Sequence, residues 1–230
     1  MEIINLRQKY LFLSSSASDV SSFLIKLDQL GQIWLFNCYE GCQHILAKKK
    51  IKISQITKIV ITELSIQKIS GLLGLLSSLS LNTKIDKIDI YGPKGLEYYL
   101  LLGRKYSQTS FRYRLYFHII STGLIISNDF VKLYACINNL NYLYFDYYII
   151  TKEVPGRFNL NEALIYKVPI GPLYGQLKKG VNFILPDGYI LYGNSFTQSY
   201  NLGIKVAFLN NDCNRSTIEN TKYSTYIFTE

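Results

Sequence analysis

The sequence has no hydrophobic stretch long enough to cross a membrane. Its most hydrophobic segment, residues 71–81, is interrupted by serines and falls short of the roughly 20 residues that a spanning helix needs. The first residues carry neither the basic cluster nor the long hydrophobic run of a secretory leader. We therefore expect an intracellular, soluble protein without a membrane partner.

Cysteine and histidine are scarce. Without a leader, the four cysteines are expected to stay reduced, which excludes a disulfide-stapled secreted domain. Cys38 and Cys42 are close in sequence, but no second Cys/His pair accompanies them to complete a structural zinc site. The four are Cys38, Cys42, Cys136 and Cys213, and the two histidines are His44 and His118.

Acidic residues are outnumbered, with 25 Lys and Arg against 16 Asp and Glu and a formal net charge of +9. This balance favours an anionic partner such as nucleic acid, with an ordinary basic soluble domain as the alternative. Hydrophobic residues make up 48% of the chain, enough for one folded domain of 230 residues. The 20 tyrosines, with many Ile, Lys and Asn, indicate an A+T-rich gene, for which a plastid genome is one natural home.

Hydrophobic periodicity predicts strands alternating with helices in the first half of the chain, then a run of strands. This order indicates an α/β fold with a mixed sheet. The Gly- and Pro-rich residues 154–195 are expected to form mainly loops. Expected strands cover residues 23–27, 33–36, 56–61, 87–91, 114–118, 131–136 and 147–151, and expected helices cover 43–50, 69–81 and 96–104.

Three blocks of sequence follow one another in a characteristic order. The first is residues 34–44 (WLFNCYEGCQH), and the second is residues 70–76 (SGLLGLL) followed by 88–96 (IDIYGPKGL). The third comprises residues 155–159 (PGRFN), 169–180 (PIGPLYGQLKKG) and 185–188 (LPDG). In order and spacing these blocks resemble the ribonuclease Z family, the tRNA 3′-end endonucleases of the metallo-β-lactamase superfamily, in which the first block reads L-F-D-C-G-E-G-T-Q.

The resemblance implies one domain over residues 1–230 with the αβ/βα four-layer sandwich of the metallo-β-lactamase fold. It also implies that about residues 155–195 form a projecting Gly/Pro-rich arm, the exosite that clamps the tRNA elbow in that family. The alternative is a plain surface loop with solvated lysines. The residues expected to shape the arm or to contact RNA phosphates are Arg157, Gly171, Pro172, Lys178 and Lys179.

Members of the family cut RNA with two zinc ions, which lower the pKa of a bound water. Their signature ligand motif, H-x-H-x-D-H, follows a buried strand, and here its positions are Glu63, Ser65, Gln67 and Lys68. None of these side chains is an imidazole, and a protonated lysine repels a metal and offers it no lone pair. The resemblance therefore predicts that the signature ligands are lost.

The other ligand positions of the family are changed as well. Residues 138–141 contain no histidine where one is expected, and Asn211 lies where the bridging aspartate belongs, with Asp212 one residue later. His44, on an expected helix, and His118, on a hydrophobic strand, match no ligand position. We therefore expect no zinc and no catalytic residue in the family's positions.

Three functions stay open at this point. The chain could bind precursor tRNA as a non-catalytic protein, either as a homodimer or with a catalytic ribonuclease Z. It could be an active metal-dependent tRNA 3′ endonuclease whose altered site uses Glu63, Asp212 and Glu230. It could also be a scaffold or the relic of a lost enzyme.

Overall fold

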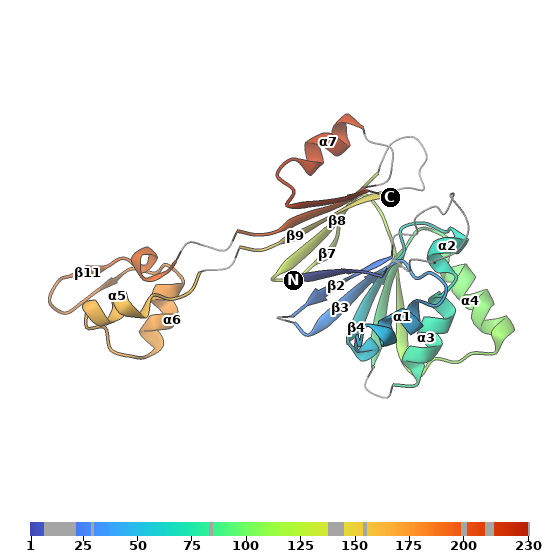
Figure 1. Cartoon of the computed structure of the whole chain (residues 1–230), viewed down its shortest axis with the longest axis horizontal. Helices are drawn as coiled ribbons and strands as arrows, with labels where there is room; N and C mark the ends of the chain where they lie inside the picture. Colours follow the sequence, from blue (N-terminus) through green and yellow to red (C-terminus); the bar gives the residue numbers. More distant parts are fainter. Residues whose placement is uncertain are drawn as a thin grey trace.

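The computed structural model describes residues 1–6, 22–28, 30–82, 85–137, 145–153, 156–198, 202–209 and 214–229. Within these residues, two β-sheets pack face to face and helices lie on their outer faces (Figure 1). Residues 156–198 form a separate unit, which Figure 1 shows standing away from the two sheets; we call it the small lobe. The layers follow the order expected for the four-layer sandwich.

The first sheet contains six strands in chain order. β1, β2 and β3 pair antiparallel, and β3 to β6 pair parallel. All five strands predicted here are confirmed, whereas β1 was not predicted because four residues show too little periodicity. The strands are β1 (Glu2–Asn5), β2 (Phe23–Leu27), β3 (Gln32–Phe36), β4 (Ile56–Val60), β5 (Lys87–Gly92) and β6 (Arg114–Ile119).

The second sheet has five strands in the order β13-β12-β9-β8-β7. Its pairs are antiparallel except for β12 and β13, which are parallel. The predicted strands at residues 131–136 and 147–151 are confirmed as β8 and β9. The strands are β7 (Gly123–Ser127), β8 (Val131–Ile137), β9 (Phe145–Thr151), β12 (Lys205–Leu209) and β13 (Tyr226–Thr229).

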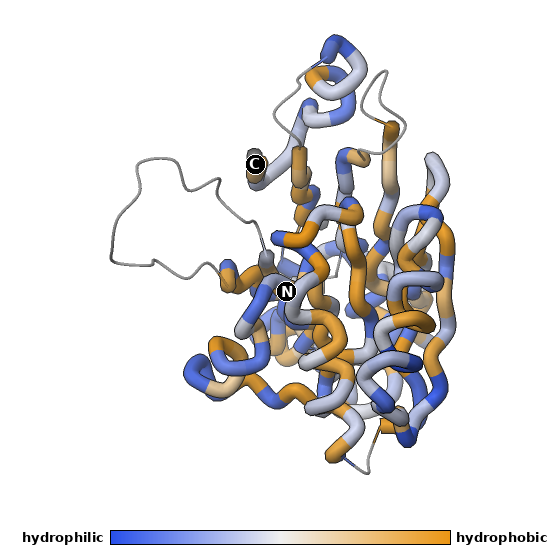
Figure 2. The backbone as a smooth tube through the Cα atoms, turned by 90° about the vertical axis from the view of Figure 1, so that its right-hand side faces the viewer, coloured by the Kyte–Doolittle hydropathy of each residue, from blue (hydrophilic) through white to orange (hydrophobic). Residues whose placement is uncertain are grey.

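Aromatic side chains fill the space between the two sheets. Phe23 of the first sheet stacks on Phe208 of the second, with ring centroids 3.7 Å apart, and on Phe36 at 4.5 Å. Trp34 and Tyr147 are also buried in this core. Figure 2 shows the matching hydrophobic stretches along the strands in the middle of the molecule. Burial of this hydrophobic surface is the main force that holds the sheets together.

Four helices cover the outer face of the first sheet: α1 (Cys42–Lys48), α2 (Ile66–Ile69), α3 (Leu72–Ser80) and α4 (Leu96–Ser107). The helix predicted over residues 69–81 is confirmed as α3, except at its start, where the chain is divided at Gly71 and Ile69 belongs to α2. There the Gly71 N–H donates a hydrogen bond to the Cys38 carbonyl at 2.9 Å. A 3₁₀ turn, η1 (Ile53–Gln55), precedes β4.

Among the residues that the structure describes, one helix, α7 (Arg215–Thr221), accompanies the second sheet. The Thr217 hydroxyl donates to the buried carboxylate of Asp146 on β9 at 3.2 Å, which ties this helix to the sheet. None of the helices in the described part of the chain is long and hydrophobic enough to span a membrane.

The small lobe has its own hydrophobic core, formed by Ala163, Val168, Leu177, Leu191 and Phe196. The prediction of mainly loops in this stretch is therefore wrong in part. A short helix and a hairpin carry too few residues to show clear periodicity, so Gly and Pro dominated the pattern. The elements are α5 (Leu160–Ile165), α6 (Pro172–Lys178), β10 (Phe183–Ile184), β11 (Ile190–Leu191) and the 3₁₀ turn η2 (Gly193–Phe196).

The cysteines of the described residues, Cys38, Cys42 and Cys136, are not paired with one another. Cys38 and Cys42 are fully buried beside each other between β3 and α1. The hydrogen bond with Cys42, together with burial, raises the pKa of Cys38 well above its usual value. Both observations fit structural thiols in a core and not reactive ones.

Candidate metal site and RNA-binding lobe

The segment that we expect to correspond to the zinc-binding motif follows β4 and contains an ion pair. The Lys68 ammonium lies 3.3 Å from the Glu63 carboxylate, and the two side chains are only 9% and 18% exposed. Ser65 precedes the first turn of α2 and accepts the Lys68 N–H through its carbonyl at 3.0 Å. Gln67 projects from the exposed side of α2. The structure thus brings Glu63 and Lys68 together and leaves Gln67 at the surface.

Residues of the first sequence block hold this segment in place. Asn37, at a left-handed φ of 56°, accepts hydrogen bonds from the Thr62 N–H at 2.9 Å and the Thr62 hydroxyl at 3.0 Å. The Cys38 N–H donates to the Lys68 carbonyl at 2.7 Å. These hydrogen bonds fix the backbone of the segment, although its side chains are not the histidines and aspartate of the family motif.

The predicted RNA-contacting residues all lie on the small lobe, but not at one spot. Gly171 and Pro172 begin α6, whereas Lys178 and Lys179 lie at its end, about 10 Å away for a helix of this length. Both lysines are exposed. Arg157 is exposed too, and its carbonyl accepts the Gln198 N–H at 2.9 Å where the chain enters and leaves the lobe. The structure thus brings the two lysines together and separates them from Gly171 and Pro172.

Sequence comparisons find relatives named ycf56 and ribonuclease Z. The chain is 43% identical to the uncharacterized protein ycf56 of Porphyra purpurea over 209 residues, which cover 90% of this chain and 78% of that protein. It is 40% identical to the ribonuclease Z of Acaryochloris marina over 83% of this chain and 60% of that protein. The chain belongs to the ribonuclease Z family. No family profile matches it.

Solved structures confirm the metallo-β-lactamase fold. The short form of human tRNase Z matches with a TM-score of 0.53 and 25% identity, over 66% of this chain and 64% of that one. The long-form RNase Z from yeast matches with a TM-score of 0.59 over 99% of this chain and 32% of that one. The chain spans about 60% of the length of the ribonuclease Z relatives, so their activity is not transferred to it by similarity alone.

The zinc ions of the ribonuclease Z family do not fit the residues at the motif. A metal there would meet the Lys68 ammonium, and Glu63 already pairs with that ammonium. Within the described ranges, no three His, Cys, Asp or Glu side chains form a group that could hold a metal ion. Asn211, Asp212, Glu230 and residues 138–141 lie outside the described residues. The expected absence of zinc therefore stays a prediction.

The two histidines lie apart from the motif. His44 is exposed on α1. His118 lies on β6, where its ring stacks on Tyr91 with centroids 4.5 Å apart and its Nε2 lies 3.1 Å from the Asp89 carboxylate. Lys58 lies 3.4 Å from the same carboxylate. Sequence reasoning missed this cluster because its members come from three separate strands, β4, β5 and β6.

The Asp89 cluster predicts an acid-sensitive contribution to stability. Burial raises the pKa of Asp89, but the hydrogen bond with His118 and the charge of Lys58 outweigh it, so the pKa is lowered overall. The ionised carboxylate therefore stabilises the fold above its unfolded pKa of about 3.9, and the contribution is lost as the pH falls through the lower folded value. We expect Asp89→Asn to destabilise the protein at pH 6 and much less at pH 3, measured by urea unfolding at both pH values. An equal loss at both would contradict this assignment.

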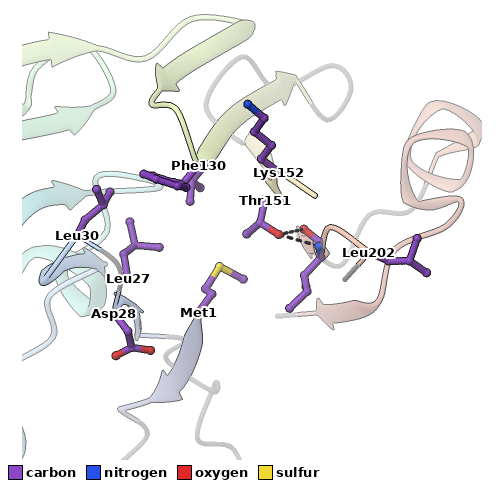
Figure 3. A pocket seen from close by; sticks show the side chains of 10 residues that line it. Met1, Leu27, Asp28, Leu30, Phe130, Thr151, Lys152 and Leu202 are labelled. Carbon is purple, nitrogen blue, oxygen red and sulfur yellow. Dashed lines mark hydrogen bonds between the residues drawn. The ribbon is translucent and has the colours of Figure 1, made fainter. Parts of the chain in front are cut away.

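A cavity of about 250 Å³ lies between the sheets at the end from which the chain enters the small lobe. Figure 3 shows the side chains of Met1, Leu27, Leu30 and Phe130 gathered around it. At its wall, Thr151 and Ile204 exchange three hydrogen bonds, of 2.7, 2.9 and 3.3 Å, that join β9 to the segment before β12. The lining is mainly hydrophobic and includes no residue of the three sequence blocks, so we assign it to packing.

Proposed function

We propose that this member of the ribonuclease Z family binds precursor tRNA through its small lobe and does not cleave it unaided. The observation that carries the proposal is the Glu63–Lys68 ion pair. Both residues are at positions where the resemblance leads us to expect the family's zinc ligands. Beside this altered motif, the lobe is a folded unit with its own core. A protein that only binds RNA in tRNA 3′-end processing needs a folded RNA-binding lobe. It does not need an intact set of metal ligands.

The charge of the lobe supports contact with RNA. Residues 156–198 contain four cationic side chains, Arg157, Lys167, Lys178 and Lys179, against two carboxylates, Glu162 and Asp187. All four cations are exposed. Exposed Lys and Arg supply the phosphate contacts that give nucleic-acid binding its affinity and its salt dependence.

The placement of the lobe supports a partner subunit. Phe36 is the last residue of β3, at the end of the strand that leads towards the altered motif. Tyr147, near the start of β9, lies beside it, with the two ring centroids 6.1 Å apart. β9 therefore begins at the same end of the sandwich as the altered motif. β9 then runs to Thr151 at the opposite end of the sandwich, and the lobe follows (Figure 1). An RNA held by the lobe therefore lies at the far end from the chain's own motif. This arrangement suits a second copy of the chain or a catalytic ribonuclease Z.

The location of the protein is part of the proposal. The relatives from Porphyra purpurea and Pyropia yezoensis carry ycf56 names, which imply plastid-encoded genes. Together with the A+T-rich composition of the sequence, this supports a role in plastid tRNA processing.

The lysines at the end of α6 are expected to set the salt dependence of tRNA binding. The double substitution of Lys178 and Lys179 to Ala removes two phosphate contacts, so the slope of log affinity against log salt should fall in magnitude by about two. The matched control is Lys94→Ala with Lys105→Ala, which removes two exposed charges from the sandwich. We expect the control to keep the wild-type slope. Equal slopes for all three proteins would exclude these lysines as phosphate contacts.

The proposed function itself is tested by comparing two RNAs of equal length. The full-length protein should bind a precursor tRNA more tightly than an unstructured random RNA in the same buffer, because the lobe is expected to recognise folded tRNA. Equal affinity for the two RNAs would contradict precursor-tRNA recognition and would favour a scaffold or relic.

A further inference from the structure

The small lobe carries a cavity of about 280 Å³ that no sequence block predicted. It lies between the end of α5, the turn before β11 and the 3₁₀ turn η2. Three tyrosines line it, Tyr166, Tyr189 and Tyr192. The side chain of Phe196 also lines the cavity and is buried in the core of the lobe, so this hollow has a fixed floor.

The tyrosine rings are arranged as an open aromatic wall. Tyr166 and Tyr189 have ring centroids 5.7 Å apart at an interplanar angle of 36°, and Tyr166 lies 5.6 Å from Phe196. Tyr189 and Tyr192 are 54% and 60% exposed although they border a hydrophobic core. Large aromatic side chains left exposed around a hollow are typical of a binding surface.

The charge of the lobe as a whole favours an anionic ligand with flat aromatic groups. At the hollow itself the charge is mixed, because the Asp187 carboxylate accepts the Tyr189 N–H at 3.1 Å. Lys167 follows Tyr166 directly and is exposed, and the lobe as a whole has more cationic than anionic side chains. A hydrophobic peptide or a lipid tail could pack against the tyrosine rings but would make no favourable contact with these cations. RNA satisfies both, because unpaired bases stack on tyrosine while the flanking phosphates meet lysine and arginine.

We propose that Tyr166, Tyr189 and Tyr192 form a pocket that receives an unpaired nucleobase of RNA by stacking. The inference rests on the proposed function and extends it, since it adds single-stranded RNA to the ligands of the lobe. In a precursor tRNA, such bases occur in the loops and in the 3′ trailer. The pocket thus adds a contact that paired RNA cannot make.

The test uses the full-length protein with two labelled probes, a single-stranded uridine octamer and an RNA hairpin whose nucleotides are all paired because its two strands are joined by a non-nucleotide linker. Stacking of one base on one aromatic ring changes affinity by roughly tenfold. We expect Tyr189→Ala to weaken octamer binding by about this factor and to leave hairpin binding unchanged. Tyr189→Phe should bind as the wild type does, because it keeps the ring and loses only the hydroxyl. Tyr192→Ala, at a more exposed position, is the second variant in case Tyr189→Ala disturbs the lobe.

The matched control is Tyr98→Ala, which removes a tyrosine that is 71% exposed on α4 of the sandwich. Unchanged octamer binding in both alanine variants, or an equal loss in Tyr98→Ala, would overturn the pocket. So would a wild-type protein that binds the hairpin and precursor tRNA but not the octamer, and in that case the proposed function stands. If the octamer binds through the tyrosines while precursor tRNA binds no better than random RNA, the pocket stands and the proposed function fails.

Discussion

Gly71→Ala is expected to lower the free energy of unfolding by about 3 kcal/mol or more, the largest loss we expect from a single methyl group. A Cβ at this position would overlap the Tyr39 carbonyl oxygen and lie 2.8 Å from the Tyr39 carbonyl carbon. Both atoms belong to the backbone, so no change of rotamer relieves the overlap. Because the Gly71 N–H also bonds the Cys38 carbonyl, moving either segment would break that hydrogen bond as well.

The matched control for Gly71 is Gly175→Ala in α6, where an added Cβ meets nothing within 4 Å. A glycine inside a helix costs about 0.5–1 kcal/mol relative to alanine, so this variant should be as stable as the wild type or slightly more so. Urea unfolding measures both variants. A Gly71→Ala protein with wild-type stability would mean that the segment between α2 and α3 is not packed against residues 38 and 39.

Glu63→Gln is expected to destabilise the protein by about 2 kcal/mol. The substitution removes the negative charge that lies beside the buried Lys68 ammonium, and breaking a fully buried pair in this way costs about 3–5 kcal/mol. The expected loss is smaller here because the Glu63 side chain is 18% exposed, so solvent partly screens the pair.

The double variant Glu63→Gln with Lys68→Met separates charge from packing. Replacing both charges by neutral groups of similar size often leaves stability unchanged, so the double variant should regain most of the stability that Glu63→Gln loses. Urea unfolding of the single and double variants measures the coupling. If Glu63→Gln has the same free energy of unfolding as the wild type, the ion pair does not form in solution. Glu63 of the wild-type protein would then be available to hold a metal.

The sequence predicted most of the sandwich because its long hydrophobic strands show clear periodicity. Strands such as β4 and β5 consist of buried Ile and Val beside polar residues, which is a local signal. The small lobe gave no such signal, since its core is assembled from residues as distant as Ala163 and Phe196. Gly71 shows the same limit, because a continuous helical pattern cannot reveal that the backbone of another segment lies against one glycine.

The altered motif could be identified from the sequence because its positions are fixed by a neighbouring strand. The pairing of Glu63 with Lys68 could not be predicted from the sequence, because it depends on the turn between β4 and α2. The Asp89 cluster and the tyrosine pocket were missed for a similar reason. Each is built from residues of several elements, and only the folded chain brings them together.

Binding without cleavage is tested by incubating the purified protein with a labelled precursor tRNA in added zinc or manganese and following both complex formation and release of the 3′ trailer. We expect a complex that contains uncut precursor with either metal. Release of the 3′ trailer would contradict this expectation, and would turn attention to an altered metal site built from Glu63, Asp212 and Glu230.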